Sequence, residues 1–277
     1  MTTIKTDQPV GIVNSAYFHQ HFSLQRFYPS SPLEAIVDHY WIVKWQLPDG
    51  EGYTQSVIPH PNTHLTFIEN ASHIQGICQT KYSHTMTGKG QVLGIKFKPA
   101  GFYPFAYKAG VAMSALVNQV EDIAKFFPTC SALKQIETTF LHSTIDEERL
   151  RELEYVMFTD VLSGQLSVND KVNLVNQMVH RIETNKSIMS VNDLCALYQL
   201  DNRGLQRLFS QYVGVSAKWI INRFRIHDAL TQVETNKQVD WTKLAVDLGY
   251  YDQAHFIKDF KALMGVTPKQ HQAEILT

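Results

Sequence analysis

Two groups of polar side chains in the C-terminal part of the chain have the types and spacing needed to recognise nucleic-acid bases. Each group lies at the start of a predicted helix, one beginning after Asp201 and the other after Asp252. Arginine, lysine, asparagine and glutamine near a helix N-terminus are the side chains that hydrogen-bond base edges in a DNA major groove. The candidate DNA-binding residues are Asn202, Arg203, Gln206 and Arg207 in the first group, and Tyr251, Gln253, His255 and Lys258 in the second.

For one such helix alone, a solvated polar face is the simpler interpretation, but the surrounding pattern occurs twice. Three pairs of residues lie 51 positions apart: Leu205 and Phe256, Phe209 and Phe260, Gly214 and Gly265. A repeat of this length that occurs only twice is not a solenoid, which needs about three or more stacked units. The repetition therefore favours two copies of one binding unit over two unrelated polar faces.

Each copy is predicted to be a helix–turn–helix unit. In the first copy, Ser190 can cap a helix, with an acidic residue three positions later as in a capping box, and Asp201 can cap the next helix. In the second copy, Asp240 and Asp252 take these two positions, and Gly249 supplies the turn between the helices. The polar candidates therefore lie on the second helix of each unit.

Residues Ser190 to His271 resemble the DNA-binding domain of the AraC/XylS family of transcriptional regulators. The second copy carries most of the resemblance, in Leu248-Gly249-Tyr250, Asp252-Gln253-Ala254-His255-Phe256 and Gly265-Val266-Thr267-Pro268. The first copy departs from the family pattern at Gln199, where a turn glycine is usual, and at Ala217, where proline is usual. Gly204 inside the first recognition helix also predicts a softer first unit, because a mid-helix glycine costs roughly 0.5–1 kcal/mol relative to alanine.

The resemblance implies a bacterial regulator that binds double-stranded DNA. Each unit would place its second helix in one of two successive major grooves, roughly 34 Å apart. A long helix, about Ala217 to Glu234, would connect the units through a face carrying Ile220, Phe224, Ala229 and Leu230. Residues Gly88 to Pro99 resemble, more loosely, a barrel-plus-helices module of uncharacterised family members. Such a module implies a small-molecule effector or a homodimer, and RNA polymerase would be a partner if the protein activates transcription.

Length and composition fit a protein of two domains. The chain has 277 residues, of which 44% are hydrophobic, as in ordinary folded proteins. Its net charge of −1 does not indicate nucleic acid, so DNA contact must depend on where the charges lie. We predict an N-terminal regulatory domain over residues 1–165 and a DNA-binding domain over residues 175–277.

The predicted fold class is α+β. Short β-rich segments separated by turns over residues 8–107 predict a small β-barrel or sandwich. Helices are predicted over residues 120–127, 132–141, 145–162 and 169–183, followed by the all-α domain of two helix–turn–helix units joined by a long helix. The third of these helices has an apolar stripe, Leu150, Leu153, Met157 and Val161. The stripe can pack on the barrel or form a dimer seam, and both interpretations stay open.

A barrel of this kind could hold an effector or a metal ion. The candidate effector pocket comprises Trp41, Trp45, His64, Phe67 and Phe97, although aromatic residues on strands more often form plain core. The alternative function is a metal-dependent barrel enzyme fused to a DNA-binding domain, with His60, His64 and Glu69 as its ligands and His19 and His21 further upstream. Pro61 argues against a shared strand face for His60 and His64, and no phosphate loop or nucleophile motif is present. We therefore predict no enzymatic activity, no cofactor and no metal site.

The remaining features concern compartment and control. Cys78, Cys130 and Cys195 are far apart and form no Cys-x-x-Cys motif, which favours a reduced protein. The first residues lack the apolar core of a signal peptide, and no apolar run approaches the length of a membrane span. These features predict a cytoplasmic protein with no membrane partner. A ligand-free regulator, controlled only by its concentration, is the last alternative.

Overall fold

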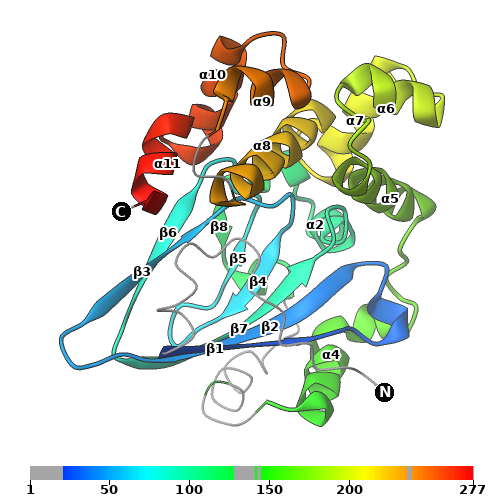
Figure 1. Cartoon of the computed structure of the whole chain (residues 1–277). Coiled ribbons are helices and arrows are strands. Elements are labelled where there is room, and N and C mark those ends of the chain that lie inside the picture. The colour runs from blue at the N-terminus through cyan, green and yellow to red at the C-terminus, as the bar shows by residue number, and fades with distance from the viewer. Residues whose placement is uncertain (1–20, 128–140, 142–144, 236–238, 277) are drawn as a thin grey trace.

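The chain folds into a sheet-rich N-terminal part and a helical C-terminal part (Figure 1). A computed structural model describes residues 21–127, 141, 145–235 and 239–276. The described strands are β1 (Phe22–Phe27), β2 (Val37–Gln46), β3 (Gly52–Val57), β4 (His64–Phe67), β5 (His73–Gln75), β6 (Tyr82–Thr87), β7 (Lys89–Phe97) and β8 (Val120–Glu121). The α+β prediction is confirmed.

The strands form two antiparallel sheets rather than a closed barrel. Six strands pair in the order β1-β2-β7-β4-β5-β8, and β3 pairs only with β6 within the described part of the chain. In Figure 1, the β3–β6 ribbon extends beside the larger sheet. The sandwich form of the prediction therefore fits, whereas the barrel form does not, because β1 and β8 are not paired with each other.

The helices follow the predicted order with one exception. The described helices are η1 (Ser31–Leu33), α2 (Tyr103–Lys108), η2 (Met113–Leu116), η3 (Ile123–Lys125), α4 (Glu147–Leu162), α5 (Asp170–Thr184), α6 (Val191–Tyr198), α7 (Asn202–Tyr212), α8 (Ala217–Thr235), α9 (Trp241–Asp247), α10 (Gln253–Met264) and α11 (Pro268–Leu276). None of them is long and apolar enough to cross a lipid bilayer.

The helix predicted over residues 120–127 is wrong. Its first residues form β8, where Glu121 pairs with Ile74 of β5. Asp122 then caps the short helix η3 by accepting a hydrogen bond from the Ala124 N–H. Strand pairing to a distant segment thus prevails over the local helical spacing. The helix predicted over residues 132–141 lies, apart from Leu141, outside the described residues.

Strand alternation divides the six-stranded sheet into two different faces. Tyr40 and Ile95 point into the main core and are fully buried, as are their neighbours on the same face. Trp41 lies on the opposite face, directly over Gly94 of β7, where an added Cβ would lie 2.0 Å from the indole ring. Any side chain at Gly94 would therefore displace this tryptophan.

Helix α4 packs on the core face through its apolar stripe. Leu150, Leu153 and Met157 are buried, and Val161 packs against the same cluster. Of the two interpretations of this stripe, packing on the N-terminal sheet domain is confirmed. Leu150, Leu153 and Met157 are covered within one chain and are therefore not free to form a dimer seam.

A buried carboxylate fixes α4 to the start of the sheet. Glu154 is only 2% exposed, and its Oε1 accepts hydrogen bonds from the Ser30 N–H at 2.9 Å and from the Tyr40 hydroxyl at 3.0 Å. Arg151 also donates to this carboxylate at 2.6 Å. Burial, together with the charge of Glu154, raises the pKa of Tyr40 well above its usual range, so this phenol remains a donor.

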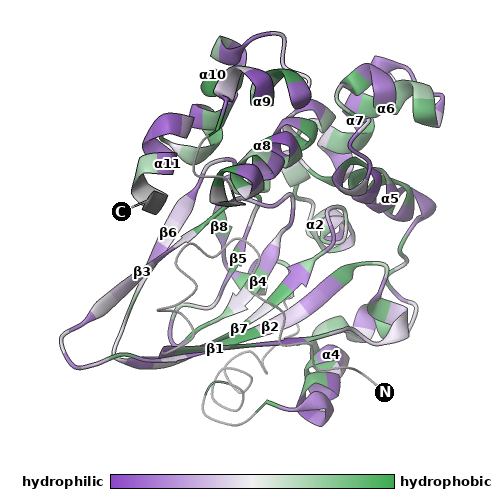
Figure 2. Ribbon diagram, viewed as in Figure 1, coloured by the Kyte–Doolittle hydropathy of each residue, from purple (hydrophilic) through white to green (hydrophobic). Residues whose placement is uncertain are grey.

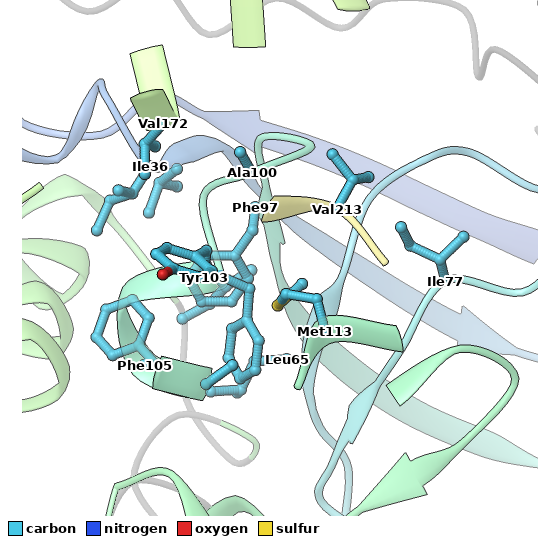
Figure 3. Close-up of a cluster of buried hydrophobic side chains, with 14 of the residues drawn as sticks. Ile36, Leu65, Ile77, Phe97, Ala100, Tyr103, Phe105, Met113, Val172 and Val213 are labelled. Atoms are coloured by element: carbon cyan, nitrogen blue, oxygen red, sulfur yellow. The ribbon is translucent and has the colours of Figure 1, made fainter. Parts of the chain in front are cut away.

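The main core continues from the sheet into the first helix–turn–helix unit. Figure 3 shows Val213 in one cluster with Ile77, Tyr103 and Met113 of the N-terminal part. The rings of Tyr103 and Tyr212 lie 4.2 Å apart, and the Gln211 side chain donates to the Tyr103 hydroxyl at 3.0 Å. The first unit therefore shares its core with the N-terminal domain.

The second unit has a separate core. Phe256 and Phe260 pack with residues of α8 and α9, and Ile58 is the N-terminal-domain residue among the buried members of this cluster. A single backbone hydrogen bond of 2.7 Å, from the Lys81 N–H to the Leu263 carbonyl, adds to this contact. The N-terminal domain thus holds the first unit much more extensively than the second.

Replacing Glu154 with alanine should lower the free energy of unfolding by about 2–4 kcal/mol, because the buried Tyr40 hydroxyl and Ser30 N–H lose their acceptor. Urea denaturation followed by circular dichroism measures this change. Glu152 is exposed on the same helix, so Glu152→Ala is a matched control with an expected change below about 0.5 kcal/mol. Equal denaturation midpoints for Glu154→Ala and the unsubstituted protein would contradict the assignment.

Candidate nucleic-acid interface

The first helix–turn–helix unit is built by capping interactions that the sequence predicts. Ser190 and Asp193 form a complete capping box at the start of α6. Asp201 caps α7 by accepting a hydrogen bond from the Gly204 N–H at 2.8 Å. Leu205 and Phe209 are buried on one side of α7, and the opposite side carries four exposed candidates: Asn202, Arg203, Gln206 and Arg207.

The second unit repeats this construction. Asp240 caps α9, and Asp252 caps α10 by accepting from the His255 N–H at 2.7 Å. Phe256 is fully buried on the inner side of α10, while His255 and Lys258 are exposed. The predicted caps and core positions of both units are confirmed.

Two further candidates, Tyr251 and Gln253, differ in whether another side chain of the protein holds them in place. Tyr251, which precedes the cap of α10, is 93% exposed and is one of the most accessible large side chains. Gln253 is half-buried and accepts a hydrogen bond from the Thr242 hydroxyl of α9 at 3.1 Å. Its orientation is therefore set within the unit, whereas Tyr251 is available for contact with a partner.

Asn202 also has a partner that the sequence did not indicate. The Cys195 thiol of α6 donates to the Asn202 Oδ1 at 3.3 Å. Cys195 is half-buried. Before the turn the two copies are offset by 50 positions, so Leu194-Cys195 corresponds to Leu244-Ala245. The second unit therefore has no thiol at this position, and this contact exists only in the first unit.

The turn of the first unit keeps a left-handed backbone without a glycine. Gln199 has φ of 53° and ψ of 41°, and the matching Gly249 has φ of 75°. The departure from the family pattern is thus accommodated by strain rather than by a different turn, at a cost of roughly 1–2 kcal/mol.

Gly204 has a different role from the one expected. Because α7 begins at Asn202, this glycine lies in the first turn and donates its N–H to the cap. An added Cβ would lie 2.7 Å from the capping oxygen of Asp201. The prediction that a mid-helix glycine softens the first unit is therefore corrected.

Helix α8 connects the two units as predicted. Its first turn is capped by Ser216, whose hydroxyl accepts from the Trp219 N–H at 3.2 Å. Ile220 and Phe224 belong to the core of the first unit, whereas Ala229 and Leu230 belong to the core of the second. Figure 1 shows the two units at opposite ends of this helix.

The predicted effector pocket is not assembled as one site. Phe67 and Phe97 are fully buried in the main core. Trp41 and His64 lie on the opposite face of the sheet, with their rings 6.4 Å apart, and Trp45 lies over Gly90 on that same face. The sheet itself therefore separates the two groups, because alternate residues of a strand point to opposite faces.

The metal site of the alternative function is also not assembled. The His60 Nε2 lies 3.0 Å from the guanidinium of Arg223, a cation that disfavours a metal ion at that nitrogen. Burial lowers the pKa of His64 to about 3, and Glu69 is exposed in a loop. Among the described residues, no three His, Cys, Asp or Glu side chains form a metal-binding group. His19 and Cys130 lie outside this part of the chain.

A polar cleft that the sequence did not reveal lies between the N-terminal domain and α5. Its volume is about 670 Å³, and the residues that line it include Asp38, His60, Asn62, Lys96, Lys98, Asn173, Gln177, His180, Glu183 and Phe224. In Figure 2, the ribbon of α5 is coloured mainly as hydrophilic residues on the side that faces the viewer. The lining comes from five separate segments, so no local motif could have indicated it.

The charged groups of the cleft differ in how they are paired. Burial alone would raise the pKa of Asp38, but hydrogen bonds with His39 and Lys96 and the charge of Lys96 outweigh it and hold that pKa well below its usual range. Within the described chain, the side chains of Lys98, Asn173 and Gln177 make no hydrogen bond or ion pair. The cleft therefore offers an unpaired ammonium beside free amide groups.

Two family models match separate parts of the chain. Residues 25–122 match a domain of unknown function, DUF6597, and residues 194–274 match a helix-turn-helix domain. A curated relative, an uncharacterized HTH-type transcriptional regulator of Haemophilus influenzae, is 25% identical over 85 residues, which are 31% of this chain and 28% of the relative. This chain therefore matches less than a third of that relative's length.

Solved structures of ToxT from Vibrio cholerae are weakly similar to this chain. ToxT from strain O395 is 14% identical with a TM-score of 0.36, covering 93% of this chain and 99% of that one. Wild-type ToxT from strain SCE256 with a bound unsaturated fatty acid is 15% identical with a TM-score of 0.37, covering 98% and 97%. Scores of this size support no argument about ligand or mechanism.

Replacing Gln199 with glycine should raise the free energy of unfolding by about 0.5–1 kcal/mol. Glycine relieves the strain of a positive φ, and its larger loss of backbone entropy on folding offsets part of that gain. Thermal and urea denaturation measure the change. Gly249→Ala is the matched substitution at the same turn of the second unit and should act in the opposite direction, since it adds strain and brings a Cβ within 2.6 Å of the Met189 sulfur. A destabilised Gln199→Gly protein would contradict this account of the first turn.

Proposed function

We propose that this chain, which carries an AraC-type helix-turn-helix domain, is a sequence-specific transcriptional regulator whose α7 and α10 enter two successive major grooves of DNA. One observation carries the proposal: two helices with buried inner faces present their polar N-terminal turns to solvent from the two ends of one connecting helix. Such a pair can engage both grooves on one side of a duplex.

The candidate DNA-binding side chains are proposed to make two kinds of contact, with base edges and with the phosphate backbone. Arg203, Gln206 and Arg207 are proposed to reach base edges in one groove, and Gln253, His255 and Lys258 in the next. Asn202 begins α7 and Tyr251 precedes the cap of α10, where they can contact the phosphate backbone or neighbouring bases. Residues 180–277 carry 12 lysines and arginines against 10 acidic residues, a net charge of only +2. Specificity must therefore come from these placed groups more than from overall attraction.

Control is proposed to pass through the first unit. Tyr103 and Met113 of the N-terminal domain pack in the same core as Tyr212 and Val213. A change in the N-terminal domain would therefore shift α7 before it affects α10. This arrangement suits control by a bound effector or by self-association, and RNA polymerase would be a partner if the protein activates transcription. A homodimer would have to use a surface other than the buried stripe of α4.

The polar cleft is the proposed effector site, in place of the pocket expected inside the barrel. Lys98 supplies an unpaired positive charge, Asn173 and Gln177 supply amide hydrogen-bonding groups, and Phe224 supplies an apolar wall. This set suits a small hydrophilic anion, such as a hydroxylated carboxylate or phosphate ester, rather than a long apolar chain. Phe224 lies on α8, so a ligand here would contact the helix that connects the DNA-binding units.

Replacing Arg207 with alanine should remove about 1–3 kcal/mol of preference at one base pair if Arg207 contacts guanine through two hydrogen bonds. Selection of the full-length protein on random duplex DNA, followed by binding measurements on single-base variants of the selected site, measures this loss. Lys89 is exposed on β7 in the N-terminal domain, and Lys89→Ala should leave both affinity and preference unchanged.

Two other outcomes of this experiment have definite meanings. A uniform loss of affinity on every sequence would reassign Arg207 to a phosphate contact. If the unsubstituted protein selects no motif above salt-sensitive background binding, the proposed function itself is wrong.

A small hydrophilic anion that occupies the cleft should raise the melting temperature of the full-length protein. At a concentration of 100 times Kd, the stabilisation is about 2.7 kcal/mol, or roughly 5–10 °C for a protein of this size. Differential scanning fluorimetry with a panel of hydroxy acids, sugar phosphates and inorganic phosphate measures this shift. Lys98→Gln should abolish the shift, whereas Lys89→Gln should retain it. No shift with any compound would favour the ligand-free regulator.

A further inference from the structure

Arg225 on α8 contacts segments of both helix–turn–helix units. Its Nε donates to the Leu248 carbonyl at 2.6 Å, and its guanidinium carbon lies 3.7 Å from the centre of the Tyr250 ring. Leu248 and Tyr250 belong to the turn between α9 and α10 of the second unit. The Nη1 of Arg225 also donates to the Met189 carbonyl at 3.4 Å. Met189 directly precedes the capping box of the first unit.

Neighbouring side chains complete this junction. The Asn222 side chain, one turn earlier on α8, donates to the Asp259 carboxylate of α10 at 2.7 Å and accepts from Arg225 at 3.5 Å. Met189 packs directly against the turn of the second unit, because an added Cβ at Gly249 would lie 2.6 Å from its sulfur. The two units therefore approach each other closely here, with Arg225 between them.

From this geometry we infer that Arg225 is a positioning residue that sets the relative placement of α7 and α10, and thereby the spacing between the two blocks of DNA that the protein accepts. This inference rests on the proposed function. A guanidinium has a planar fork of donors and a face that stacks on aromatic rings, so one side chain can hold two carbonyls and a tyrosine at once. A lysine ammonium has neither the fork nor the face.

The groups that accept hydrogen bonds from Arg225 restrict where the neighbouring chain segments can lie. Two of the three acceptors are the backbone carbonyls of Leu248 and Met189, which cannot move by a change of rotamer, so the guanidinium constrains the paths of the two chain segments themselves. Leu248 and Met189 lie immediately beside the first helices of their units, α9 and α6. A shift of either segment relative to α8 would break a hydrogen bond or the stacking on Tyr250.

A second arginine on the same helix provides a matched comparison. Arg223 is 1% exposed, and its Nε donates to the Pro59 carbonyl of the N-terminal domain at 2.6 Å. Two residues along a helix turn the direction of a side chain by about 200°. Arg223 thus holds α8 against the N-terminal domain, whereas Arg225 holds it against the two units.

The spacing of the two DNA blocks reports directly on this constraint. Adding one base pair moves the second block by about 3.4 Å and rotates it by roughly 35° about the duplex axis. Two units held in one relative placement can accept only one such arrangement. Two units that move independently would accept several arrangements, with lower affinity for each because the second contact has a lower effective concentration.

The test measures binding of the full-length protein to a family of duplexes that carry the selected site with zero, one or two base pairs added to or removed from the segment between its blocks. The unsubstituted protein should lose about 10-fold or more in affinity when one base pair is added. Arg225→Met should bind the original site about 10-fold more weakly and should lose less than about 3-fold further on the altered spacings.

Arg223→Met is the control for loss of a buried arginine. It should lower the melting temperature but retain the steep dependence on spacing. Asn222→Ala removes the neighbouring contact to Asp259 at smaller structural cost, and it should flatten the spacing dependence in the same direction if Arg225→Met does not fold.

Several outcomes overturn the inference while leaving the proposed function intact. The first is a steep dependence on spacing for the unsubstituted protein that neither Arg225→Met nor Asn222→Ala changes. The second is a flat dependence for the unsubstituted protein, and the third is an equal flattening by Arg223→Met. Failure of the unsubstituted protein to select any two-block site instead overturns the proposed function, so the two failures are distinguishable.

Discussion

The apolar core that passes from the N-terminal sheet into the first helix–turn–helix unit is the contact on which the rest of the structure depends. Tyr103 and Met113 form one buried cluster with Tyr212 and Val213. Separating these groups would expose large aromatic and aliphatic surfaces to water, which is the dominant unfavourable term in opening a folded chain. The two halves of the chain therefore behave as one folded body at the first unit, even though their architectures differ.

This shared core makes the two helix–turn–helix units unequal. The first unit is fixed to the N-terminal domain by aromatic packing, whereas the second has its own core and touches that domain at Ile58 and at the backbone of Lys81. Helix α8 joins the two cores, since its first half packs in the core of the first unit and its second half in the core of the second. A signal that enters the N-terminal domain can therefore reach the second unit through α8, on which Arg223 and Arg225 face different partners, as well as through the direct contacts of Ile58 and Lys81.

The polar groups of the interior differ in whether other groups of the protein already bind them. Glu154 is fully used in holding α4 to the sheet, and Arg223 is used in seating α8 on the N-terminal domain. The cleft beside α5 differs from both, because Lys98 and the amides of Asn173 and Gln177 face it without partners among the described residues. These unused hydrogen-bonding groups are the reason that the cleft is proposed as a binding site.

The sequence by itself determined the helix–turn–helix units, because their signals are local. A capping aspartate, a helical period of apolar residues and a turn residue all act within a few positions, so Asp201, Asp252, Phe256 and Phe260 could be placed without knowing the rest of the fold. Only the tertiary structure decided which residues meet across the sheet and between the domains. Strand register separated Trp41 from Phe97, pairing with β5 turned a predicted helix into β8, and the approach of distant segments created the cleft and the contacts of Arg225. Such contacts depend on the relative placement of elements far apart in the chain, which no local pattern encodes.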